Sequence, residues 1–230
     1  MVLLDLNAAL PPVWQPHCWL GGGAVPQTSG GRAALRQHWL ETALNRLGAL
    51  PVGPESLTGQ HHAPVWPKGH VGSVSTLRGP GGQDWLLGWL GRSAHCAALG
   101  LDAELLMDEK TATALAPVLL TRAEQAEWAR QHDPARWVTQ VFCLKEALFK
   151  LLSPWQSQPL PFEAAELRVL VPESGQAQLM LTCDWGPVPS GLRLGLWVGA
   201  GPVLPGAPPW VLATGSLSAD WRQRFPPCSG

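Results

Sequence analysis

The chain has 230 residues, of which 46% are apolar and only 14% charged, and its formal net charge is -1. A globular chain usually has about 25% charged residues. A nucleic-acid-binding protein usually has a basic excess, and a disordered tail is poor in apolar residues. The composition therefore argues against both classes and predicts a folded chain of one or two domains.

The sequence has no feature of a secreted or membrane-spanning protein. Residues 1–5 show no basic segment ahead of an apolar run, as a secretory signal would. The longest uncharged stretch, 194–219, contains four prolines and five glycines, which disfavour a membrane helix. The five cysteines are odd in number and form no C-x-x-C pair. We therefore expect a cytoplasmic protein with reduced thiols and no membrane contact.

Residues 1–30 are rich in proline and glycine and have an apolar, strand-like start. Beyond them, the spacing of apolar residues predicts the helices and strands. The four-residue spacing from Leu35 to Leu47 predicts a helix over 31–47, and the capping box at 121–124 begins another that runs to about 131. Further helices are predicted at 108–120 and 136–152, and strands at 71–75, 84–90, 94–106, 164–171, 176–183, 192–198 and 210–215. Helix-containing segments followed by runs of strands favour an α+β fold.

Two carboxylates stand two positions apart in the predicted strand at 94–106. In a strand, residues i and i+2 face the same side, so Asp102 and Glu104 would point together. Like charges in this position are most stable with a cation between them, and oxygen ligands with open positions suit Mg²⁺. The alternative is an exposed strand edge or a pair of salt-bridge partners.

The segment Phe142-Cys-Leu-Lys-Glu-Ala-Leu-Phe-Lys150 is a second candidate. Glu146 and Lys150 are four residues apart on the predicted helix, a favourable spacing for an ion pair. Taken alone, the segment is better explained by a solvated pair that contributes roughly a few tenths of a kcal/mol at most.

A third candidate is the rigid turn Pro64-Val-Trp-Pro67, followed by Val71-Gly-Ser-Val-Ser75. Small residues let a backbone approach a ligand closely, and serine hydroxyls with backbone N–H groups can hold a phosphate. The sequence has no Walker loop, no G-x-G-x-x-G and no G-x-S-x-G.

The motifs P-x-W-P, G-S-x-S, G-x-D-x-E, T-x-x-E and F-x-x-K-E-A occur in this order over about residues 31–150. Together they resemble the Sfp-type 4'-phosphopantetheinyl transferases, most closely the enterobactin synthetase component D branch. The resemblance implies a monomer with two similar α+β subdomains, 1–97 and 98–230, related by a pseudo-twofold. It also implies Mg²⁺-dependent transfer of the phosphopantetheine arm of coenzyme A to a serine of an acyl or peptidyl carrier protein. The other product would be 3',5'-ADP, and the role would lie in siderophore or other secondary-metabolite biosynthesis.

The same resemblance implies roles for individual residues. The metal ligands would be Asp102, Glu104 and Glu146. Coenzyme A would be contacted by Arg32, Ser75, Lys145 and Lys150, and Lys145 would also serve catalysis. The attacking serine needs a base within hydrogen-bond reach, and either Glu146 or Glu124 can serve.

The sequence departs from the resembled pattern at two basic positions. The pattern has histidine after G-S-x-S, whereas this chain has Thr76, which cannot carry positive charge. The pattern also has a basic residue just before P-x-W-P, and the nearest candidates here are His61, His62 and Lys68. His62 would take over part of that role, and the alternative is that the two histidines are a solvated pair in a loop. Thr76 motivates an alternative function, a non-catalytic binding module for coenzyme A or a carrier protein. A structural domain without a nucleotide site is a further alternative. Carrier docking is expected near Arg122, Arg130 and Arg136.

Overall fold

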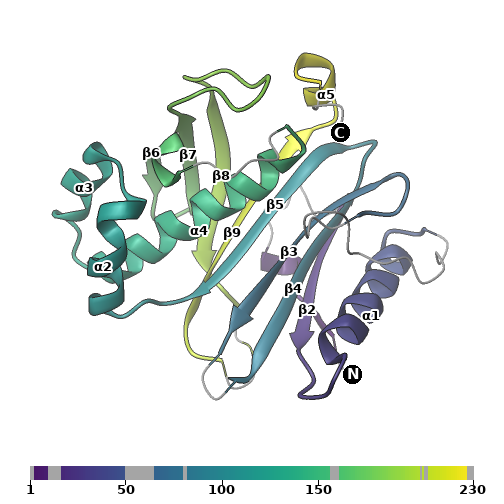
Figure 1. Cartoon of the computed structure of the whole chain (residues 1–230). Coiled ribbons are helices and arrows are strands. Elements are labelled where there is room, and N and C mark those ends of the chain that lie inside the picture. Colours follow the sequence, from purple (N-terminus) through teal and green to yellow (C-terminus); the bar gives the residue numbers. More distant parts are fainter. Residues whose placement is uncertain are drawn as a thin grey trace.

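The computed structural model describes residues 3–9, 17–49, 65–79, 82–155, 161–202, 204 and 207–226. An antiparallel sheet of four strands, in the order β1-β2-β4-β3, forms the first part of the chain (Figure 1). Helix α1 (Gly31–Arg46) packs against β2 and β4 of this sheet. The strands are β1 (Leu4–Asp5), β2 (Cys18–Ala24), β3 (His70–Arg78) and β4 (Asp84–Arg92), and a 3-10 turn, η1, spans Asn7–Ala9.

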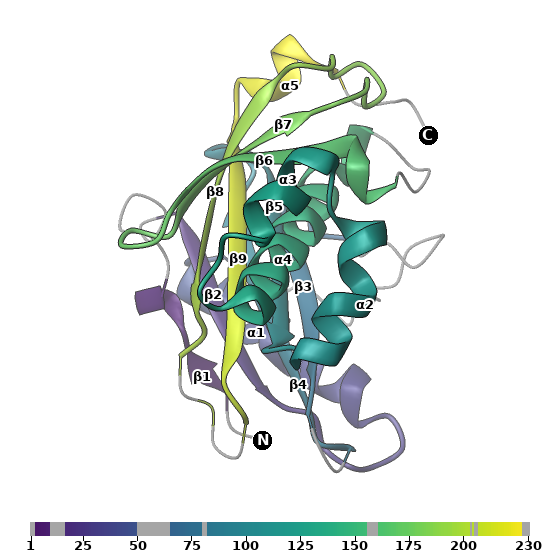
Figure 2. The ribbon, with the colours of Figure 1, turned by 90° about the vertical axis from the view of Figure 1, so that its left-hand side faces the viewer.

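The second part of the chain forms an antiparallel sheet in the order β5-β9-β8-β7-β6. Helices α2, α3 and α4 lie together beside it (Figure 2). The strands are β5 (Cys96–Leu105), β6 (Ala165–Val171), β7 (Gln176–Leu181), β8 (Arg193–Ala200) and β9 (Trp210–Ser218). The helices are α2 (Glu109–Leu119), α3 (Arg122–Trp128), α4 (Pro134–Leu152) and α5 (Trp221–Arg224), with 3-10 turns η4 (Ser153–Trp155) and η5 (Phe162–Ala164).

Glycine and tryptophan are packed against one another in the first sheet. A Cβ atom placed on Gly88 would lie 2.2 Å from the Trp39 ring, and one on Gly21 would lie 2.1 Å from the Trp19 ring. The indoles therefore occupy space that any other residue would fill. This explains why β2, with the sequence Cys-Trp-Leu-Gly-Gly-Gly-Ala, was not predicted as a strand. Its glycines weaken the strand signal but are required by the packing.

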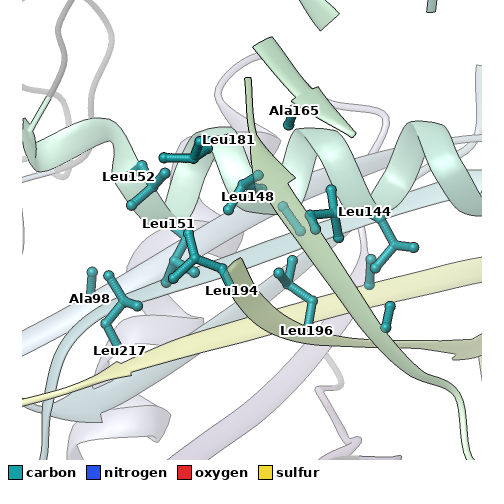
Figure 3. Packing of buried hydrophobic residues seen from close by; sticks show 14 of the residues in the cluster. Ala98, Leu144, Leu148, Leu151, Leu152, Ala165, Leu181, Leu194, Leu196 and Leu217 are labelled. Carbon is teal, nitrogen blue, oxygen red and sulfur yellow. The ribbon is translucent and has the colours of Figure 1, made fainter. Parts of the chain in front are cut away.

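Helix α4 is central to the larger core. Its side chains Leu144, Leu148 and Leu151 are fully buried and face the second sheet, where Leu194 and Leu196 lie opposite (Figure 3). The helix begins two residues before its predicted start because Pro134 occupies its first turn and the Asp133 side chain accepts a hydrogen bond from the Arg136 N–H.

The α+β class is confirmed, and most predicted elements are present with shifted ends. The capping box of α3 forms as expected, with Thr121 and Glu124 bonded reciprocally. In the described part of the chain, no helix has the length and apolar character needed to cross a bilayer. The division into subdomains 1–97 and 98–230 stays a prediction.

Candidate functional site

Strands β3 and β5 belong to different sheets but lie side by side between α1 and α4 (Figure 1). Two serines of β3 bridge them. The backbone N–H of Leu101 donates to Ser73 Oγ at 2.9 Å, and the Ser75 hydroxyl donates to Asp102 Oδ1 at 2.9 Å. Both serines and Asp102 are buried. Because side chains alternate along a strand, Ser75 on β3 and Asp102 on β5 point toward each other. Their hydrogen bond holds the Asp102 carboxylate at the junction of the two sheets.

Helix α4 brings a cation to this carboxylate. Lys150 Nζ donates to Asp102 Oδ1 at 2.7 Å and lies 3.3 Å from Ser75 Oγ. Glu146 lies one turn earlier on the same face of α4, and its charge interacts with those of Asp102 and Lys150. Three predicted residues, Asp102, Ser75 and Lys150, thus form one hydrogen-bonded cluster, with Glu104 and Glu146 beside it.

The cluster and the two glutamates beside it, Glu104 and Glu146, together hold more negative charge than positive charge. Burial first, and then the nearby Asp102 and Glu146, raise the pKa of Glu104 to about 7, against the lowering effect of Lys150 and Arg78. The pKa of Glu146 is also raised, first by burial and then by Asp102. Burial and the neighbouring carboxylates both disfavour the charged forms of these groups, so a nearby cation would stabilise them. The uncompensated charge and the oxygen-only donors match the chemistry of a hard divalent cation.

The side chains are not arranged as a closed metal site. Within the described residues, no group of three His, Cys, Asp or Glu side chains converges closely enough to hold an ion. Lys150 instead pairs directly with Asp102. A bound cation would therefore have to compete with this ammonium group for the Asp102 oxygen.

Lys145 and Glu124 lie away from this cluster, in the interior. Their side chains are 0% and 1% exposed, and Lys145 Nζ donates to Glu124 Oε2 at 2.7 Å and to the Leu119 carbonyl at 2.8 Å. The other Glu124 oxygen accepts the Leu167 N–H at 2.7 Å, and the Thr121 N–H bonds Oε2.

Those contacts argue against two expectations. Lys145 has no route to a coenzyme A phosphate, because its ammonium group is buried and directed to α2 and α3. Glu124 cannot reach a substrate hydroxyl, because both of its oxygens are bonded inside the protein. Burial also lowers the pKa of Lys145, against the opposing effect of Glu124. The ion pair of Lys145 with Glu124 connects α4 to α2, α3 and β6.

The remaining predicted ligand contacts are spread out. Arg32, at the start of α1, forms an ion pair with Asp84 at 2.7 Å and lines a hollow of about 320 Å³ beside α1. Lys68 is exposed in the turn before β3, at the end of that strand remote from Ser75. Thr76 is partly exposed in β3. His62 falls outside the described residues.

Arg78 is a residue that the sequence reasoning missed. It ends β3 and faces Asp84 across the strand pair. It shares a side of β3 with Thr76, two residues before it. Its charge lowers the pKa of Glu104, so the guanidinium group acts on the carboxylate cluster. The predicted strand ended at residue 75; an extension by three residues would have revealed this basic position.

The expected carrier-docking arginines lie around α3 and the start of α4. Arg130 pairs with Glu127 at 3.2 Å on the surface. Arg136 lines a hollow of about 880 Å³ between α3, α4 and β6. Their involvement in carrier binding stays a prediction.

Comparison with known proteins shows a similarity to one family. Residues 98–188, which contain β5 and α4, match the 4'-phosphopantetheinyl transferase superfamily. This part of the chain is therefore similar to a 4'-phosphopantetheinyl transferase domain. The matched residues include Asp102 and Glu104 on β5 and Glu146 and Lys150 on α4.

Curated relatives agree with the family match. The chain is 36% identical over 159 residues to the 4'-phosphopantetheinyl transferase Svp of Streptomyces mobaraensis, covering 66% of this chain and 58% of the relative. It is 30% identical over 132 residues to PptT of Mycobacterium tuberculosis, covering 57% and 54%. It is 30% identical over 144 residues to Npt of Nocardia iowensis, covering 61% and 59%. The matches thus span between half and two thirds of each relative's length, and the narrower enterobactin-type branch stays a prediction.

Proposed function

We propose that this protein transfers the 4'-phosphopantetheine arm of coenzyme A to a serine of an acyl or peptidyl carrier protein. The serine oxygen attacks the phosphorus next to the pantetheine group. The bond from that phosphorus to the bridging diphosphate oxygen breaks, and 3',5'-ADP leaves. The observation that carries this proposal is the cluster of Asp102, Glu104, Glu146 and Lys150 inside the region that matches the transferase superfamily.

Glu146 is the base that the geometry favours. The serine proton must pass to a group within hydrogen-bond reach, directly or through one water. Glu146 is partly exposed beside Asp102 and Lys150, whereas Glu124 is 2% exposed and fully bonded. The greater exposure of Glu146 and its place beside Asp102 and Lys150 support Glu146, and not Glu124, as the proposed proton acceptor.

Asp102, Glu104 and Glu146 would hold Mg²⁺, and the support is chemical. All three supply oxygen, and the pKa values of Glu104 and Glu146 are raised, as expected where a cation is needed. When bound, Mg²⁺ would neutralise charge on the diphosphate oxygens. Lys150, released from Asp102, would lie free to donate to a phosphate oxygen, and Ser75 would fix the Asp102 carboxylate in position.

Arg32 and Arg78 would supply the positive charge that Thr76 lacks. Both flank the single carboxylate of Asp84, so the three groups together carry a net positive charge. Arg78 also acts electrostatically on Glu104. A phosphate of coenzyme A at this end of β3 would lie between the arginines and the carboxylate cluster.

The direct test mixes the purified full chain with coenzyme A, Mg²⁺ and several apo carrier proteins of fatty-acid, polyketide and peptide-synthetase type. Mass spectrometry should show a gain of the phosphopantetheine mass on a carrier serine. The matched control is Glu173→Gln, which removes an exposed carboxylate between β6 and β7 and should keep transfer. Saturable coenzyme A binding without any mass gain would instead support the non-catalytic binding module.

A further inference from the structure

Two buried cysteines meet where the first sheet joins the second. Cys18 is the first residue of β2 and is 5% exposed, and Cys96 is the first residue of β5 and is 4% exposed. They are separated widely in sequence and belong to different sheets. Neither takes part in the site between β3, β5 and α4.

Gly91 brings the two sulfur atoms together. It is the cross-strand partner of Cys18 in the pairing of β2 with β4. A Cβ atom placed on Gly91 would lie 2.8 Å from Cys18 Sγ and 2.9 Å from Cys96 Sγ. Both sulfurs therefore point into the one space that a side chain at this position would fill. The two thiols are within hydrogen-bond reach of each other.

The neighbouring residues hold the two segments together on the other side. His17 and His95, each directly before one of the cysteines, stack with ring centroids 3.8 Å apart and planes 12° from parallel. The Cys96 thiol also donates to the Arg92 carbonyl at 3.3 Å. Both histidines are exposed, whereas both cysteines are buried. The two chain segments thus run side by side, with a thiol pair inside and a ring pair outside.

The charges around the pair favour thiolate formation at Cys96. A hydrogen bond from the Cys18 thiol lowers the pKa of Cys96, against the effect of burial, and Arg222 lowers it further. Arg222 is held there by its hydrogen bond to the Ala97 carbonyl at 2.8 Å. By contrast, burial raises the pKa of Cys143, the largest of several effects in that direction. The thiolate is the reactive form in thiol–disulfide exchange.

We propose that Cys18 and Cys96 form a reversible disulfide that ties β2 of the first sheet to β5 of the second. The oxidant is a low-molecular-weight disulfide, which reaches the pair when the two strand ends open locally. The Cys96 thiolate attacks one sulfur of the oxidant and expels one small thiolate. Cys18 sulfur then attacks the Cys96 sulfur of the mixed disulfide and expels the second. Both cysteine protons end on the two small thiols, so one protein disulfide forms and one small disulfide is reduced.

The test equilibrates the reduced full chain with mixtures of reduced and oxidised glutathione. Remaining thiols are trapped by alkylation after denaturation, and the peptides are mapped by mass spectrometry. Cys18 and Cys96 should leave the alkylated pool together and appear as one cross-linked peptide pair within a monomer. Cys143 should stay alkylated. Persistence of both thiols at the oxidising end, or a disulfide of either cysteine with another partner, would overturn the proposal.

Thermal unfolding gives a second readout that does not depend on transferase activity. A cross-link that closes a long loop should raise Tm by roughly 5–10 °C, and dithiothreitol should reverse the rise. Cys183→Ser, at a partly exposed cysteine outside the pair, should keep the oxidation-dependent shift. Cys96→Ser should abolish it. An unchanged Tm at the oxidising end of the glutathione series would contradict a cross-link between the two sheets.

Discussion

Lys145→Met should destabilise the protein strongly. The substitution keeps the length of the apolar stem but removes an ammonium group that is 0% exposed and bonded to Glu124 and the Leu119 carbonyl. Removing one partner of a buried ion pair costs about 3–5 kcal/mol. Glu124 keeps its two backbone N–H donors, from Thr121 and Leu167, so we expect the lower end, about 3 kcal/mol. For a chain of this size, Tm should fall by roughly 6–12 °C.

Urea unfolding followed by circular dichroism measures this loss, with activity assayed at a temperature where each variant is folded. Lys110→Met is the matched control, because Lys110 is exposed on α2 and its removal should change stability little. The double variant Lys145→Met/Glu124→Gln should lose less than the sum of the two single variants, because the pair is coupled. A Lys145→Met protein with unchanged stability and lost transfer would refute the structural role and restore the phosphate contact expected from the sequence.

Three further predictions concern the carboxylate cluster and its surroundings. Glu104→Gln should stabilise the metal-free protein at pH 8 and not at pH 4. The pKa of Glu104 is raised from 4.5 to about 7 on folding, so the stability of the unsubstituted protein falls as pH rises through this window and is then level. Glutamine carries no charge at either pH and avoids this loss. The ceiling is about 3 kcal/mol, which solvent screening of this half-buried group reduces to about 1 kcal/mol in urea unfolding; an equal effect at both pH values would contradict the shift. Asp102→Asn should lower kcat by at least about 100-fold and remove the rise of Tm caused by Mg²⁺; a retained Mg²⁺ effect would place the cation elsewhere. Arg78→Gln should raise KM for coenzyme A roughly fivefold with little change in kcat, measured at low salt, and a loss confined to kcat would exclude a role in phosphate binding.

Periodicity predicted the helices and most strands well because burial on one face leaves a regular pattern in sequence. It also predicted that Asp102 and Glu104 share a face of one strand and that Glu146 and Lys150 share a face of one helix. It could not predict that β3 lies beside β5, because contacts between two sheets leave no periodic signal. The hydrogen bonds of Ser75 with Asp102 and Lys150 depend on that contact.

Lys145 shows where motif reasoning and periodicity disagree. The motif placed Lys145 with Glu146 and Lys150 as one functional group. The helical pattern instead puts Lys145 four residues after Val141 and three before Leu148, both fully buried. A lysine on an apolar face needs a buried partner. The sequence therefore contained a signal for the internal ion pair with Glu124, but not for which acidic residue would supply it.

The charged residues of α4 have two different roles: Lys145 forms an internal ion pair, and Glu146 and Lys150 belong to the candidate site. Successive helical residues are about 100° apart around the axis, so Lys145 and Glu146 point in different directions. Glu146 and Lys150 face β5, whereas Lys145 faces α2 and α3. Apolar packing alone is non-directional and fixes the rotation of a helix weakly. The Lys145–Glu124 pair, bonded at both ends to defined backbone groups, restricts that rotation, and the rotation in turn determines whether Glu146 and Lys150 meet Asp102.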